Sequence, residues 1–157
     1  MLDELAQNII RELQEDARQS FREIGRKLDV SEGTVRNRVK SLLGSDTMRI
    51  TAVPNPEQLG LNFMCIMCLE VKAGAAQTVE ARLVQSPNVY YLAGCTGNYD
   101  IIGLFAFHSP ADFDAFVKNV IATIPEVVRT STYVVMHVSR SPWAHNLDVK
   151  ALGRARK

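Results

Sequence analysis

Cysteine is scarce in this chain of 157 residues, and tryptophan occurs once. Three cysteines, Cys65, Cys68 and Cys95, are too few for a disulfide framework, so free buried thiols are expected. Cys65 and Cys68 form a C-x-x-C pair in strand-like surroundings. Residues three apart on a strand point to opposite faces, whereas a metal or redox pair needs both sulfurs on one side. The sequence therefore predicts neither a metal site nor a cofactor.

Long apolar runs are also missing, since no segment approaches the roughly 18 uninterrupted apolar residues of a membrane helix. The chain does not begin with a basic stretch, an apolar run and a small-residue cleavage site. We therefore expect a cytoplasmic protein without a membrane partner. The sequence has no Gly-rich phosphate loop, no H-E-x-x-H and no nucleophile elbow, so no catalytic residues and no enzyme activity are predicted.

Charge is nearly balanced, at a formal +1, but it is distributed unevenly along the chain. Residues 1–17 carry one base against five acids, whereas residues 18–49 carry eight bases against four acids. The last residues are basic again, with four bases against one acid from residue 141 onward. The basic surplus at residues 18–49 predicts an anionic partner for that region.

The first third of the chain predicts three short helices. Apolar residues recur at helical spacing from Leu2, with Asp3 as N-cap, and Ser20 with Glu23 forms the S-x-x-E capping box of a second helix. Asp29 suits the left-handed conformation that ends this helix, and Ser31 caps the third. A helix of about eight residues, a turn of about three and a second capped helix are typical of a helix-turn-helix. An extended run at 48–53 would then form a wing.

The third helix has a polar side opposite its stripe of Val35, Val39 and Leu42. Long donors and an amide on an exposed helix face suit a recognition helix in the major groove of double-stranded DNA. A solvated amphipathic face is the plain alternative, and Arg38, near the buried stripe, equally suits an ion pair with an acid of the first two helices. The residues predicted to bind DNA are Ser31, Gly33, Thr34, Arg36, Asn37, Lys40 and Arg22.

The remainder of the chain alternates strands and helices. Strands are predicted at 61–71, 89–96, 100–107 and 127–138, with helices at 78–85 and from Ser109, whose neighbour Pro110 suits the first helical position. This βαββαβ order predicts a ferredoxin-like antiparallel sheet with both helices on one face. Apolar residues on both sides of two strands predict that another subunit covers the other face.

Taken together, the motifs of the two parts resemble those of the Lrp/AsnC family of transcription regulators. The resemblance runs from about residue 2 to 139 and includes "SFREIGRKLDVSEGTVRNRVKSL" at 20–42, "TGNYDIIG" at 96–103 and "IPEVVRTSTYVV" at 124–135. It implies an α+β protein with a winged helix-turn-helix domain at 1–52, a linker at 53–61 and a βαββαβ effector domain, the RAM domain, at 62–140. A basic tail at 141–157 lies outside the resemblance.

The family resemblance also implies a function, namely sequence-specific transcription regulation modulated by a small amino-acid effector. It implies homodimers, assembled through the sheet, and higher homo-oligomers with the effector bound between subunits. Asp100 could pair with an α-ammonium group, and backbone amides near Gly97 could hold a carboxylate. Judged by spacing alone, Gly97 and Asn98 are better explained as a two-residue hairpin loop, and only the family resemblance favours a ligand site. The implied effector-binding residues are Gly97, Asn98, Tyr99, Asp100, Thr130 and Thr132.

Three departures from the family pattern leave other functions open. Ala6 and Asp29 stand where the family usually has Asp and Gly, and "GSDTM" at 44–48 replaces a Glu-rich stretch with a Gly before the wing. The sequence therefore does not determine whether a wing forms or whether Arg49 contacts a phosphate. A sensor that has lost DNA binding is one alternative. Another is an AsnC-like enzyme acting on sirohaem, which would use His108, His137 or His145.

Overall fold

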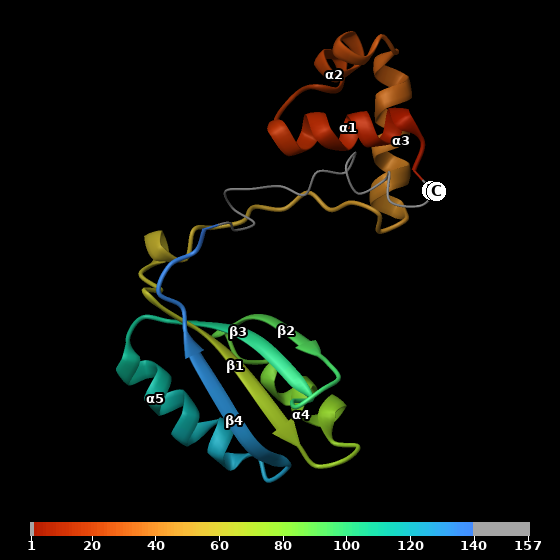
Figure 1. The fold of residues 1–157 in the computed structure, drawn as a ribbon. Helices are drawn as coiled ribbons and strands as arrows, with labels where there is room; N and C mark the ends of the chain where they lie inside the picture. Colours follow the sequence, from red (N-terminus) through yellow and green to blue (C-terminus); the bar gives the residue numbers. More distant parts are fainter. Residues whose placement is uncertain (1, 140–157) are drawn as a thin grey trace. The chain divides into compact units, whose positions relative to one another are not determined.

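The computed structural model describes residues 2–139, which divide into two compact units, residues 2–53 and residues 54–139 (Figure 1). The basic tail predicted at 141–157 lies outside the described residues. In the part that is described, no helix is long and apolar enough to cross a membrane.

The first unit consists of three helices, α1 (Glu4–Glu15), α2 (Phe21–Leu28) and α3 (Glu32–Gly44). Each begins at the predicted cap, because the side chains of Asp3, Ser20 and Ser31 accept the backbone N–H groups of Ala6, Glu23 and Thr34. The capping box of α2 is complete, and hydrogen bonds from the Ser20 backbone and hydroxyl lower the pKa of the Glu23 carboxyl. The buried side chains of the unit come from all three helices: Ala6, Ile9, Ile10, Leu13, Ile24, Val35, Val39 and Leu42.

The turn between α2 and α3 depends on two residues. Asp29 adopts the left-handed conformation with φ of 54°, and the N–H groups of Asp29 and Val30 both donate to the Gly25 carbonyl. A Cβ at position 25 would lie 2.7 Å from the Val30 carbonyl oxygen. Gly25 therefore admits the backbone of the turn between the two helices.

Gly25→Ala is expected to destabilise the helical unit by about 2 kcal/mol. Overpacking against rigid backbone costs up to about 3 kcal/mol, and Ala recovers about 1 kcal/mol of helix propensity. Gly44→Ala is the matched control, because nothing lies within 4 Å of a Cβ at that position of α3. Urea unfolding followed by far-UV circular dichroism measures both. Equal stability of the two variants would contradict the steric account.

The segment after α3 turns as predicted but forms no wing strand. Asp46 has φ of 53°, and the Thr47 and Met48 N–H groups both donate to the Leu42 carbonyl. Met48 packs against the helical core, which draws the chain back along α3. Residues 48–53 then run without strand pairing to any described residue. The predicted wing is therefore not formed by the described residues of the first unit.

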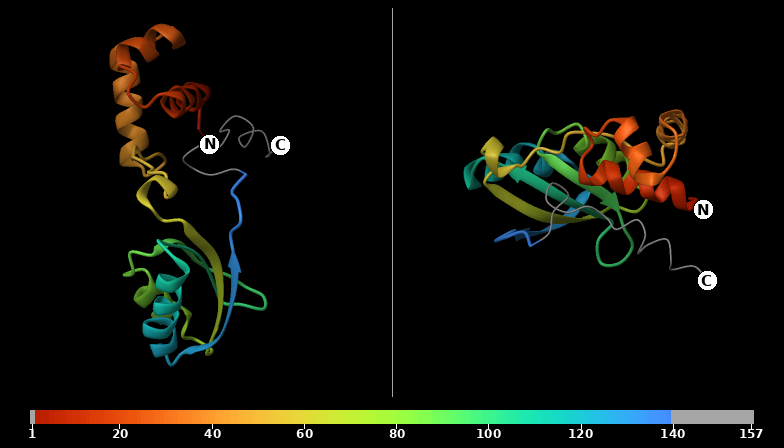
Figure 2. Two further views of the ribbon diagram at one scale, coloured as in Figure 1. Left: turned by 90° about the vertical axis from the view of Figure 1, so that its left-hand side faces the viewer. Right: turned by 90° about the horizontal axis from the view of Figure 1, so that it is seen from above.

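The second unit is a four-stranded antiparallel sheet with two helices. Its elements are β1 (Phe63–Val71), α4 (Ala76–Leu83), β2 (Val89–Gly94), β3 (Ile101–Phe107), α5 (Pro110–Asn119) and β4 (Val127–Val134). The strand order is β2-β3-β1-β4, which is the predicted βαββαβ arrangement. Figure 2 shows α4 and α5 on the same face of the sheet. The last strand ends at Val134, earlier than the predicted residue 138.

The core of this unit lies between the helices and one face of the sheet. Cys65, Met67 and Leu69 alternate along β1 and are fully buried against residues of both helices. Five phenylalanines pack against one another at the α5 side, with ring centroids 5.4 to 6.4 Å apart: Phe63, Phe105, Phe107, Phe113 and Phe116. Burial raises the pKa of the Cys65 thiol to about 11. Cys65 and Cys68 are thus buried free thiols as predicted, whereas Cys95, in the loop after β2, is exposed.

The opposite face of the sheet, which we call the open face, carries no element of its own unit. Strand alternation places Met64, Ile66 and Cys68 of β1 there, next to Ile102 and Leu104 of β3. Tyr91 and Tyr133, on the two edge strands of the same face, are 59% and 58% exposed. Met64 and Cys68 are buried in the single chain, whereas Ile66 is exposed and Ile102 and Leu104 are partly exposed, so the open face has an apolar surface with a tyrosine at each side.

Candidate DNA-binding helix and effector loop

The polar side of α3 is exposed and hollowed. Val35, Val39 and Leu42 are buried, so residues about half a turn away point outward. A shallow pocket of about 300 Å³ on this side is lined by Thr34, Asn37, Arg38 and Ser41. Within residues 2–139, neither Asn37 nor Lys40 has a side-chain hydrogen bond or ion pair. Both therefore keep their full donor and acceptor capacity for a partner.

Three of the other predicted DNA-binding residues on α3 and its cap already have intramolecular contacts. The Ser31 hydroxyl caps α3 and lies 2.8 Å from the Thr34 hydroxyl, and Arg36 pairs with Glu32 one turn earlier. A Cβ at Gly33 would make an ordinary contact, 3.7 Å from the Ser31 hydroxyl oxygen. Exposed pairs of this kind contribute only about 0–1 kcal/mol, so a phosphate could displace Glu32 from Arg36.

Three basic residues around the helix-turn-helix form intramolecular ion pairs, and a fourth, Arg22, has no such partner among the described residues. The Arg38 guanidinium lies 2.8 Å from Asp3, so the predicted ion pair with the first helices is confirmed. Lys27 donates to Glu12 of α1 at 2.6 Å, and this hydrogen bond raises the pKa of Lys27. Arg49 pairs with Asp46 at 2.8 Å. Arg22 is exposed on α2, and no described group binds its guanidinium.

The loop between β2 and β3 spans residues 95–100 and is longer than a two-residue hairpin turn. The Cys95 N–H donates to the Asp100 carbonyl at 2.8 Å, which leaves four residues outside the ladder. Gly97 has φ of 132°, a conformation that only glycine adopts readily. Gly97 and Asn98 form the exposed tip of this loop. The plain hairpin reading is therefore replaced by a projecting loop with free backbone groups.

Tyr99 folds back from this loop over the open face of the sheet. Its hydroxyl lies 2.6 Å from the Ser131 hydroxyl on β4, although β3 and β1 separate the loop from that strand. The Arg129 guanidinium lies 5.4 Å from the Tyr99 ring centroid and binds Glu70 at 3.0 Å. Cation–π contacts at exposed sites contribute about 0.5–1 kcal/mol. The loop is thus tied to the far edge of the sheet.

Asp100 anchors the base of the loop. One carboxylate oxygen accepts the Val71 backbone N–H at 2.8 Å, where the pairing of β1 with β4 shifts register. The Asp100 N–H donates to the Leu69 carbonyl. A carboxylate has about four acceptor positions, so this oxygen pair retains capacity for a ligand. The predicted ligand group therefore also has a structural role that spacing alone did not indicate.

The structure separates the two predicted threonines from Tyr99. Thr130 and Thr132 pair with Leu69 and Met67, so they share the helix-covered side of the sheet. Ser131, which the sequence analysis did not select, faces the open side with Arg129. The only sequence signal that could have identified Ser131 and Arg129 was the alternation of side chains along the strand that contains Tyr133.

Two of the three histidines considered for the alternative enzyme function lie within the described residues. His108 Nδ1 lies 3.0 Å from the Gly60 carbonyl oxygen, which joins the end of β3 to a short 3-10 turn at Glu57–Leu59. His137 is exposed after β4, and His145 lies outside the described residues. In residues 2–139, His108 and His137 have no carboxylate partner. His108 therefore acts as a contact between the start of the second unit and its sheet.

Comparisons with known proteins give the same two-part division. Residues 2–43 match the model of the AsnC-type helix-turn-helix domain, and residues 64–142 match that of the Lrp/AsnC ligand binding domain. An HTH-type transcriptional regulator of Pyrococcus abyssi, itself uncharacterised, is 36% identical over 139 residues, 88% of this chain and 94% of the relative. The regulator FL11 of the same organism is 33% identical over 136 residues, 86% of this chain and 89% of FL11.

Solved structures share the fold over nearly the whole chain. AsnC of Escherichia coli superposes with a TM-score of 0.87 at 23% identity, covering 94% of this chain and 99% of AsnC. LrpC of Bacillus subtilis gives 0.79 at 27% identity, covering 90% and 99%. A Neisseria meningitidis regulator, solved with L-Met, gives 0.82 at 21% identity, covering 90% and 94%. The chain belongs to the Lrp/AsnC family of transcriptional regulators.

Proposed function

We propose that α3 reads operator DNA in the major groove through Asn37 and Lys40. The observation that carries this proposal is that both side chains are exposed and unpaired within the described residues, on the helix that follows the capped turn. An Asn amide matches the adenine edge, and a Lys ammonium matches guanine acceptors or phosphates. Ser31, Gly33, Thr34 and Arg36 lie at the start of α3, and Arg22 on α2 adds a phosphate contact.

Fluorescence anisotropy of a labelled duplex tests this proposal. The duplex comes from the region upstream of the protein's own gene, and a scrambled duplex is the reference, both over a salt series. A specific complex keeps its sequence preference while both affinities fall with salt. If the two duplexes bind equally at every salt concentration, and further promoters behave alike, the reading role of α3 is refuted.

The second part of the proposal is an amino-acid effector at the 95–100 loop. The projecting tip at Gly97 and Asn98 offers backbone amides to a carboxylate, and Asp100 offers a carboxylate to an ammonium group. A neighbouring structure from Neisseria meningitidis contains L-Met, which supports an amino acid as the ligand class. Tyr99 would link ligand binding at the loop to the open face, whereas Thr130 and Thr132, on the helix-covered side of β4, are not included in this site.

Asp100→Asn is expected to remove the effector response and leave the fold intact. The amide oxygen still accepts the Val71 N–H, but the negative charge that pairs with an ammonium is gone. The response is the change in DNA anisotropy on titration with each amino acid, and its midpoint should rise at least tenfold. The thermal transition of the variant is the control. An unchanged midpoint with an unchanged transition would reject Asp100 as the ammonium partner.

The third part is a homodimer formed through the open face. Apolar side chains of β1 and β3, flanked by Tyr91 and Tyr133, form a surface of the kind that oligomers bury. Pairing two such faces would also bury the Tyr99, Ser131 and Arg129 contacts, which links the effector loop to assembly. Sedimentation analysis of wild type and Ile66→Glu tests it, because a buried charge should dissociate the dimer. A dimer that withstands this change would place the interface elsewhere.

A further inference from the structure

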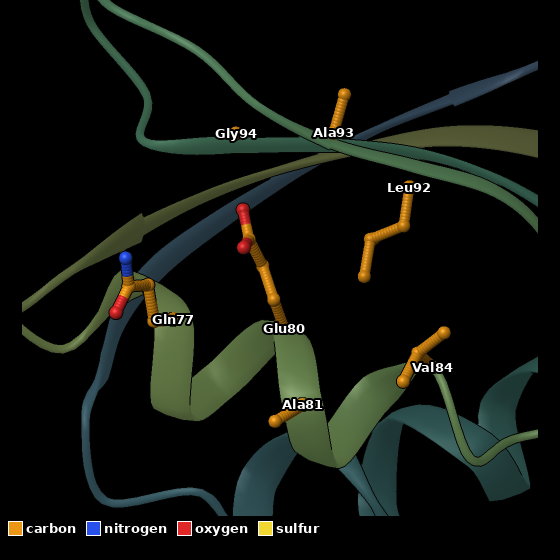
Figure 3. A pocket seen from close by; sticks show the side chains of 7 residues that line it. All are labelled: Gln77, Glu80, Ala81, Val84, Leu92, Ala93 and Gly94. Carbon is orange, nitrogen blue, oxygen red and sulfur yellow. The ribbon is translucent and has the colours of Figure 1, made fainter.

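A second pocket lies between α4 and β2, on the helix-covered side of the sheet. It has a volume of about 390 Å³ (Figure 3). One end is polar, with Gln77 and Glu80 of α4 below Gly94, and the other end is apolar, with Val84 and Leu92. Tyr99 lies over the opposite face of the sheet. The pocket is therefore separate from the loop proposed for the amino-acid effector.

Glu80 is placed in this pocket by the absence of a side chain at Gly94. A Cβ at position 94 would lie 2.7 Å from Glu80 Oε1, so any other residue would displace the carboxylate. Glu80 is only partly exposed, and within residues 2–139 its side chain has no hydrogen bond or ion pair. The Gln77 amide is equally unpartnered there. A carboxylate without a partner among the described residues keeps its acceptor positions available, and the ammonium group of a cationic ligand would fill them with charge-assisted hydrogen bonds.

The residues that line the pocket also restrict which other chemical groups the bound cation can contain. Among the described residues, the lining contains no lysine, arginine or histidine that could neutralise a ligand carboxylate, so a zwitterionic amino acid would bring an uncompensated charge. Val84 and Leu92 offer apolar surface beside the polar end, which suits methylene groups. The Gln77 amide oxygen provides a second acceptor for an ammonium group. We propose that this pocket binds a linear primary alkylammonium ion, with the ammonium at Glu80 and the alkyl chain against Leu92.

Isothermal titration of the full chain with n-pentylamine tests the site, with n-pentanol as the uncharged analogue. The amine should bind saturably at pH 7, and n-pentanol at least tenfold more weakly, because only the amine forms a charge-assisted hydrogen bond. Methyl NMR signals of Val84 and Leu92 should shift on binding. Failure of the amine to saturate, or equal binding of the alcohol, would overturn the site.

Variants separate the pocket from general attraction to acidic groups. Glu80→Gln keeps the shape and should weaken amine binding at least tenfold, and Gly94→Ala should do the same by displacing the carboxylate. Glu57→Gln, the same change at an exposed carboxylate of the same unit, should bind like wild type. Thermal unfolding confirms that each variant is folded. Unchanged binding by folded Glu80→Gln, or an equal loss in Glu57→Gln, would refute the assignment.

Discussion

Replacing Asn37 and Lys40 together with alanine is expected to abolish the preference for operator DNA over a scrambled duplex. Each base-edge contact of this kind contributes about 1–3 kcal/mol of discrimination, so the pair should account for a preference of about 100-fold. The weak, salt-sensitive affinity for any duplex should persist, because Arg22 and Arg36 still meet phosphates. Competition anisotropy at fixed salt measures the preference directly.

The matched control for this double variant is Asn119→Ala with Lys72→Ala. It removes the same two residue types from exposed positions of the sheet unit, so net charge and composition change equally. The control should keep the full operator preference. Loss of preference in both proteins would attribute the effect to net charge, and retention in both would show that α3 does not read sequence. Far-UV circular dichroism checks that the helices remain.

Phe105→Ala is expected to destabilise the sheet unit by about 3–5 kcal/mol, the usual range for removing a fully buried phenylalanine. The ring packs on Phe116, with centroids 5.5 Å apart, and also covers Gly103 two residues earlier on β3. A Cβ at position 103 would lie 2.5 Å from Phe105 Cε2. The aromatic ring therefore fills the space that the glycine leaves on the strand.

A double-mutant cycle makes this second prediction specific. Gly103→Ala alone should be destabilising because the added methyl group meets the ring, whereas in the Phe105→Leu background it should cost markedly less. Urea unfolding, followed by a spectroscopic signal that reports on the sheet unit, gives the free energy of unfolding of wild type, the two single variants and the double variant. Additive effects would indicate that glycine is required at position 103 for another reason, such as the nearby Leu92 side chain. A non-zero coupling would confirm the ring–glycine contact.

Local features of this protein were readable in the sequence because their causes are local. Asp3, Ser20 and Ser31 cap helices through hydrogen bonds to backbone groups three residues away, and Asp29 enters a left-handed turn by its own conformational preference. Apolar periodicity likewise predicted the strands and helices of the second unit. These signals, with the family motifs, were sufficient for the two-part α+β architecture and for the exposed face of α3.

Contacts between distant segments could be decided only by the tertiary structure. The sequence did not reveal that Gly25 meets the backbone of its own turn, that Asp100 accepts the Val71 N–H, or that Tyr99 reaches Ser131. The Gly25 contact depends on the path of the chain into α3, whereas the Asp100 and Tyr99 contacts depend on strand register and on a register shift after Glu70, which no local pattern encodes. Glu80 and Gly94 meet for the same reason: a helix and an edge strand bring them together only after the sheet has formed.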